Sequence, residues 1–186
     1  FDVAAAAIGL ALLAPLLLLV ALVIKLDSSG PVFFRQRRYG RNNSVFRIFK
    51  FRTMTVAEDG ERVIQAMQND PRVTRVGRFL RATSIDELPQ LINVLLGEMS
   101  IVGPRPHALV HEERFEDNFD LFSRRRRVLP GITGWAQVNG YRGETKTPED
   151  VKKRMDYDLY YIDNWSIWLD LEIVVRTFGA VLRGAH

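Results

Sequence analysis

The chain contains no cysteine among its 186 residues. This absence excludes a disulfide framework, a zinc or iron–sulfur centre held by cysteine, and a thiol nucleophile. It agrees with a protein that faces the cytosol. The sequence also lacks internal repeats, low-complexity tracts and a second domain boundary. Its length therefore predicts one domain with a real hydrophobic core.

Charged and polar side chains are absent from Val3–Ile24. As a helix this stretch would be ~33 Å long at ~1.5 Å per residue, close to the ~30 Å of bilayer hydrocarbon. A soluble helix is rarely apolar on every side over such a length. A signal peptide is the alternative, but the stretch has no basic region before it and no small-residue cleavage site. We therefore predict a membrane helix over residues 1–25.

Pro15 lies near the middle of this apolar stretch and leaves two topologies open. The helix either spans the membrane with a kink, or bends at Pro15 and returns to the face it entered. Basic residues gather just after it, so we expect that end to be cytoplasmic; they are Lys25, Arg35, Arg37 and Arg38. Because the chain begins with Phe1 rather than Met, we expect a further segment upstream.

The net charge is +4 and the pI about 9.6, which predicts an anionic partner. Residues Pro31–Arg38 and Ser44–Thr53 are short, rich in Val, Phe and Ile and separated by a turn, which predicts a β-hairpin. In the second segment, basic residues alternate roughly with apolar and aromatic ones. Such a surface is also found in nucleic-acid platforms, but we favour a half-buried hairpin near phosphate groups.

The run Arg124–Arg127 predicts a solvated face or a contact with acidic headgroups.

Adjacent carboxylates at Asp86 and Glu87 precede an amphipathic helical pattern that Gly97 ends. A capping box from Ser84 to Glu87 would place Pro89 where a backbone donor is needed. We therefore expect the helix to begin at Asp86, which brings this carboxylate to the positive end of the helix. The simpler interpretation is that both carboxylates only cap the helix.

Arginines surround the two carboxylates more densely than capping requires. Four of them recur at every third residue before the pair, namely Arg72, Arg75, Arg78 and Arg81. Arg105 follows between two prolines, which restrict its backbone. Guanidinium groups neutralise phosphate oxygens and hold them in fixed geometry. We predict Arg81 and Arg105 as phosphate-binding residues, and no nucleic-acid partner.

Phosphate chemistry gives the carboxylates distinct predicted roles. Asp86 is the candidate nucleophile, because aspartate can form acyl phosphates, and Glu87 is a candidate general base or second carboxylate. Neighbouring carboxylates also suit Mg²⁺, which we expect Asp86 to hold together with phosphate oxygens. His107 and His111 have a spacing compatible with a metal site but lack a third ligand in register.

The remaining segments predict a mainly helical α+β fold. Helices are expected over Val56–Gln68, Thr74–Ala82, Ala108–Val128 and Pro148–Asn164. Glycine-rich segments at Pro130–Trp135 and Val138–Glu144 are expected to be mobile covers over the site. A concentration of aromatic residues suits a membrane–water boundary, although core packing explains some of them equally well; they are Tyr157, Tyr160, Tyr161, Trp165 and Trp168. We predict a membrane helix, a small β-hairpin and amphipathic interfacial helices, with residues 26–186 forming one compact cytoplasmic catalytic domain.

A series of ordered motifs covers nearly all of the chain: Val32–Arg37 with Gly40, Lys50–Met54, Asp70–Arg72, Gly77–Arg81, Asp86–Gln90, Val102–Pro106 and Pro130–Trp135. Together they resemble the bacterial sugar transferases, the monotopic polyprenyl-phosphate phosphoglycosyl transferases. Gly134–Thr145 is similar to the branch that transfers glucose 1-phosphate, whose members usually carry further membrane helices upstream.

The resemblance implies transfer of a hexose 1-phosphate, with glucose expected, from a UDP-sugar to undecaprenyl phosphate. It also implies a requirement for Mg²⁺, release of UMP, and a covalent phosphosugar intermediate on Asp86. It further implies a re-entrant helix broken at Pro15, although Ala14 stands where many members have serine. The implied location is the bacterial inner membrane with the catalytic domain in the cytoplasm, at the first membrane step of exopolysaccharide, capsule or lipopolysaccharide synthesis.

Two other functions stay open at this point. A metal-dependent lipid phosphatase would use the same residues for hydrolysis and would need no nucleotide sugar. A non-catalytic module would bind acidic lipid through the basic face, with an affinity that falls steeply with salt. The sequence also leaves open whether the protein is a homo-oligomer.

Overall fold

The computed structural model describes residues 1–55, 70–109, 112, 121–142 and 147–182. Their α-helices are α1 (Asp2–Asp27), α2 (Arg75–Thr83), α3 (Gln90–Leu95), α5 (Trp135–Val138), α6 (Pro148–Asp163) and α7 (Ile167–Leu182). The strands are β1 (Phe33–Tyr39), β2 (Val45–Phe51), β3 (Ser100–Val102) and β4 (Gly131–Thr133). Short 3₁₀ turns are η1 (Arg41–Asn43), η2 (Ile85–Glu87) and η3 (Phe122–Arg127). The helix predicted over Val56–Gln68 lies outside the described residues.

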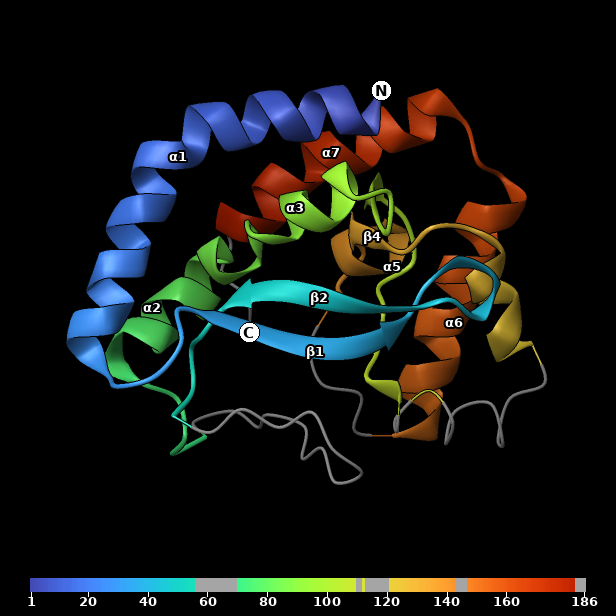
Figure 1. The fold of residues 1–186 in the computed structure, drawn as a ribbon. Helices are drawn as coiled ribbons and strands as arrows, with labels where there is room; N and C mark the ends of the chain where they lie inside the picture. The colour runs from blue at the N-terminus through green and yellow to red at the C-terminus, as the bar shows by residue number, and fades with distance from the viewer. Residues whose placement is uncertain (56–69, 110–111, 113–120, 143–146, 183–186) are drawn as a thin grey trace.

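The predicted α+β class, mainly helical with a small hairpin, is confirmed (Figure 1). Strands β1 and β2 pair antiparallel with Phe33 opposite Phe51. The turn between them uses Asn42 and Asn43 at φ of 55° and 62°, a left-handed conformation that asparagine tolerates well. Phe46 and Ile48 on β2 are buried and belong to the hydrophobic core. The hairpin is therefore half-buried, as expected from its alternating pattern.

Helix α1 contains Pro15 and bends near its middle, so its two halves run along different sides of the molecule (Figure 1). The first half packs Ala6 into a core cluster with residues of β2 and α3. The second half packs Val20 and Ile24 against Phe51 and Leu80. Within the described part of the chain, α1 is the one helix long and apolar enough to cross a membrane by length and composition. Both halves nevertheless contact the rest of the domain.

Strands β3 and β4 pair in parallel and form a second small sheet that the sequence did not predict. The prediction that Pro130–Trp135 is a mobile cover is therefore wrong, because this segment is β4 and the start of α5. A Cβ atom on Gly131 or Gly134 would overlap the backbone of Gly103. These glycines let the two backbones approach closely, which fixes the segment that leads into Arg105.

The helix expected to begin at Asp86 begins later. Ser84 ends α2 at a left-handed φ of 59°, Asp86 lies in η2, and α3 starts only at Gln90 with Pro89 as its N-cap. No side chain caps η2, so the capping box is also absent there. The left-handed Ser84 breaks the chain between two short helices, and Asp86 is therefore presented by a tight turn rather than by a helix N-terminus.

Helix α6 agrees with its prediction and starts with a capping box between Thr147 and Asp150. The aromatic segment after it folds as α7, whose Ile173 is buried against Val102 and Tyr161. The opposite surface of this region is apolar and exposed; it includes Trp165, Trp168, Val175 and Phe178. The helix is therefore amphipathic, with one face packed on the domain.

Candidate active site

Glu87 is the centre of a compact cluster of cationic side chains. The guanidinium of Arg105 donates two hydrogen bonds to it, Nη1 to Oε2 at 3.0 Å and Nη2 to Oε1 at 2.5 Å. The ammonium of Lys50 on β2 lies 3.0 Å from Oε1, and Nη2 of Arg142 lies 3.8 Å from Oε2. The Glu87 side chain is 9% exposed, so its charge is neutralised inside the protein rather than by water.

These contacts decide the ionisation of Glu87. Burial alone would raise the pKa of Glu87, but the positive charges of Arg105 and Lys50 outweigh it and hold that pKa well below its usual value. A carboxylate with a lowered pKa is a weak proton acceptor. Its role as general base stays a prediction, whereas its geometry fits a residue that orients Lys50 and Arg105.

Asp86 is also buried, with 8% of its surface exposed, but its surroundings differ. Its carboxylate accepts no hydrogen bond and forms no ion pair with any residue of the described ranges. Burial first, and then the negative charge of Glu87, raise the pKa of Asp86 to about 6. The nearby charges of Lys50 and Arg105 act in the opposite direction. The result is a desolvated carboxylate with free oxygens, facing cations that its neighbour holds in place.

Of the arginines spaced before Asp86, the structure brings Arg81 near it. Arg81 lies in the last turn of α2, and its positive charge lowers the pKa of Asp86. Arg75 and Arg78 are exposed on α2, and Arg72 pairs with Asp70 at 2.7 Å. Arg72 precedes α2, and Arg75 and Arg78 lie on the exposed part of that helix, so the three-residue spacing does not gather these side chains at the site.

Asn93 is a structural residue of the site that sequence analysis missed. It is fully buried; its Oδ1 accepts from the Phe49 amide at 2.9 Å, and its Nδ2 donates to the Arg47 carbonyl at 2.8 Å. These bonds fasten α3 to β2 beside Lys50. Lys50 and Arg142 were also not predicted as site residues, because no local pattern shows which side of a hairpin or loop meets η2.

One further prediction needs correction, and the weak metal signal at His107 gains no support. In the run Arg124–Arg127, Arg125 is 5% exposed and pairs with Asp158 at 2.8 Å, so the run is not a uniformly solvated face. His107 lies between the guanidinium groups of Arg125 and Arg154, at 3.2 Å and 3.1 Å from its ring nitrogens. Such cationic neighbours disfavour a metal ion there, and His111 lies outside the described residues.

The donor set at η2 fits Mg²⁺ with few protein ligands. The oxygens of Asp86 accept no hydrogen bond from the described residues, whereas both oxygens of Glu87 are engaged by cations. No cluster of three or more carboxylate, histidine or cysteine groups suited to a metal occurs in the described ranges. Mg²⁺ often binds one or two carboxylates together with water and substrate phosphates. Asp86 alone therefore suits the predicted ligand role.

The fold and the site define a domain that joins one apolar helix of membrane-spanning length to a buried carboxylate centre lined with cations. Comparison with known proteins makes the class specific. A family model described as bacterial sugar transferase matches residues 1–184. The chain belongs to the bacterial sugar transferase family.

The names of three relatives share undecaprenyl phosphate but differ in the sugar. The chain is 54% identical to a UDP-glucose:undecaprenyl-phosphate glucose-1-phosphate transferase of Escherichia coli K12, covering 100% of this chain and 40% of that protein. It is 55% identical to a protein of the same name from Caulobacter vibrioides, covering 97% of this chain and 68% of that protein. It is 44% identical to a UDP-N-acetylgalactosamine-undecaprenyl-phosphate N-acetylgalactosaminephosphotransferase of Aeromonas hydrophila. The match covers 98% of this chain and 43% of that protein. The chain thus spans less than half of two of these three relatives.

Proposed function

We propose that this chain transfers glucose 1-phosphate from UDP-glucose to undecaprenyl phosphate and releases UMP. The substrates follow from the names of relatives at 53–55% identity. The observation in the structure that supports the chemistry is the contrast between the two carboxylates. Glu87 holds the cations, and Asp86 keeps its oxygens free beside them.

In the first half-reaction an Asp86 oxygen attacks the phosphorus that carries the sugar. A bond forms between that oxygen and phosphorus, the bond to the bridging oxygen breaks, and UMP leaves with the electron pair. Lys50, Arg81 and Arg105 are close enough to Asp86 to act on its charge and would stabilise the negative charge that develops there. In the second half-reaction an oxygen of the lipid phosphate attacks the same phosphorus and frees the Asp86 carboxylate.

Mg²⁺ belongs to this proposal as a cofactor held by Asp86. When bound, it would neutralise diphosphate charge. Glu87 then keeps the two cations oriented without itself accepting a proton. The pKa values of the two adjacent carboxylates, which are shifted in opposite directions, support this division of roles.

The proposed location is the bacterial inner membrane, with the domain in the cytoplasm and α1 re-entrant. Two observations support the re-entrant form. Asp2 accepts a hydrogen bond from Ser100 at 2.5 Å, while Ile24 at the other end is buried against the same domain. Exposed leucines lie between these ends and include Leu12, Leu16, Leu18 and Leu19. The exposed aromatic face of α7 would lie at the lipid boundary, where tryptophan is favoured.

The donor half-reaction tests this function. Incubation of the chain with UDP-glucose and Mg²⁺, without lipid acceptor, should release about one UMP per protein and leave a phosphosugar on Asp86, because a covalent mechanism needs no acceptor for its first step. Quantified UMP and peptide mass analysis measure this result. Turnover with acceptor but no release without it would indicate direct displacement. Release of inorganic phosphate from undecaprenyl phosphate alone would instead indicate the phosphatase.

The acidic side of the pH dependence of kcat/KM for UDP-glucose gives a second test. Asp86 must be ionised to attack, and its pKa in the free protein is raised to about 6. We expect kcat/KM for UDP-glucose to be level above that value and to fall about tenfold per unit below it. Initial rates of UMP release, with circular dichroism to show that the protein stays folded, measure the limb. A limb near the ordinary aspartate value of 3.8 would contradict the proposed environment of Asp86.

A further inference from the structure

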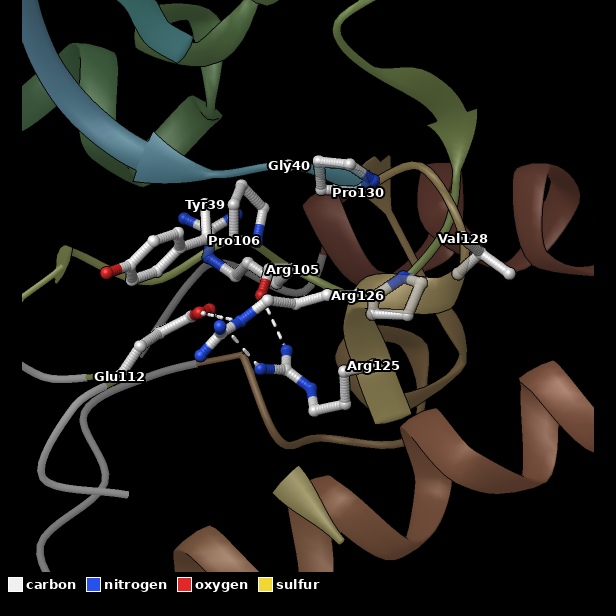
Figure 2. A pocket seen from close by; sticks show the side chains of 10 residues that line it. Tyr39, Gly40, Arg105, Pro106, Glu112, Arg125, Arg126, Val128 and Pro130 are labelled. Carbon is white, nitrogen blue, oxygen red and sulfur yellow. Dashed lines mark hydrogen bonds and ion pairs between the residues drawn. The ribbon is translucent and has the colours of Figure 1, made fainter. Parts of the chain in front are cut away.

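The loop that carries Arg105 is held from outside through its backbone. Its neighbours Pro104 and Pro106 have no N–H, so the loop's polar contacts rely largely on carbonyl oxygens. The Arg105 carbonyl accepts a hydrogen bond from Nη2 of Arg125 at 2.6 Å, which Figure 2 shows as a dashed line. The Pro106 carbonyl accepts from Nη1 of Arg38 at 3.3 Å. The position of Arg105 therefore depends on residues from η3 and β1.

Arg125 is itself fixed by α6. Its Nε donates to Oδ2 of Asp158 at 2.8 Å, and the two side chains are only 4% and 2% exposed. A buried ion pair is often no more stabilising than a well-packed apolar pair. A guanidinium, however, can donate in several fixed directions at once. Arg125 uses this property to connect Asp158, the Arg105 carbonyl and Nδ1 of His107.

We propose that Arg125 and Asp158 are a positioning pair that holds the Arg105 loop so that its guanidinium meets Glu87 correctly. The inference rests on the proposed transferase function. Neither residue touches the reacting atoms: Arg125 acts on the backbone of Arg105, and Asp158 acts on Arg125. Helix α6, more than 40 residues away in sequence, thereby controls the geometry of the site.

The variant Arg125→Lys tests the pair, because one ammonium cannot bridge Asp158 and the Arg105 carbonyl as the guanidinium does. A displacement of about 1 Å at a positioned group can reduce activity about 100-fold, so we expect kcat/KM for UDP-glucose to fall by about that factor. The variant should stay folded under the assay conditions, which thermal unfolding measures, while Lys50, Arg81 and Glu87 are unchanged in sequence.

Arg124→Gln is the matched control. Arg124 also connects η3 to α6, through a 2.9 Å ion pair with Asp163, but it does not contact the Arg105 loop. We expect this variant to keep its rate. A loss of activity in Arg125→Lys that only follows a loss of folded protein, or an equal loss in Arg124→Gln, would mean that the pair only stabilises the fold, and would overturn the proposal.

Hydrogen exchange of the Gly103–His107 segment separates this proposal from the proposed function, because it needs no substrate. Exchange should increase in Arg125→Lys and not in Arg124→Gln. If Arg125→Lys fails to fold, Asp158→Asn keeps the side-chain shape and is judged by the same measurement. Unchanged exchange in the folded variant would overturn the positioning role, whereas absent UMP release by the unmodified chain would overturn only the transferase function.

Discussion

Asp86→Asn should abolish the donor half-reaction, with UMP release reduced by at least about 10⁴-fold, because an amide cannot form the acyl phosphate. The substitution is nearly isosteric and removes a buried, unpaired carboxylate. The variant should therefore unfold at the same temperature as the unmodified protein or a higher one. UMP release and thermal unfolding are the two measurements.

The control for this variant is Asp163→Asn, which removes the same charge from an exposed position paired with Arg124. It should retain activity. If Asp86→Asn kept its turnover while Asp163→Asn behaved as expected, Asp86 would not be the nucleophile, and the division of roles between the two carboxylates would be wrong.

Glu87→Ala should destabilise the fold strongly as well as reduce activity. It leaves Lys50 and Arg105, with side chains 17% and 20% exposed, without their shared carboxylate. Removal of one partner from a buried ion pair costs about 3 kcal/mol or more of the free energy of unfolding. Chemical unfolding of the detergent-solubilised protein measures this change. The double variant Glu87→Ala, Lys50→Met should be more stable than Glu87→Ala alone, because one unpaired cation is removed. It should not regain activity.

Glu172→Ala is the comparison for this prediction. Glu172 pairs with Arg176 at 2.6 Å on the exposed side of α7, where both side chains are nearly half exposed. Exposed pairs of this kind contribute about 0.5 kcal/mol or less. Equal destabilisation by Glu87→Ala and Glu172→Ala would show that the cluster at η2 is not a buried electrostatic unit.

Local patterns predicted the elements whose signals lie in neighbouring residues. The hairpin followed from two short apolar segments around a turn, and the helices expected over Thr74–Ala82 and Pro148–Asn164 agree with α2 and α6. The parallel β3–β4 pair was missed because each strand has only three residues and its partner is about 30 residues away. The start of α3 was placed too early because nothing local indicates that Ser84 adopts a left-handed conformation.

The candidate site divides in the same way into features that local sequence predicts and features that depend on distant residues. The sequence by itself determined that Asp86 and Glu87 are adjacent, that arginines surround them and that an apolar helix precedes them, since these are properties of order along the chain. Only the tertiary structure decided that Glu87 pairs with the cations and Asp86 does not. It also brings Lys50 and Asn93 beside η2 and places Arg125 against the Arg105 carbonyl. The physical reason is that burial and charge act through space, so the ionisation of a carboxylate depends on which distant side chains the fold brings against it.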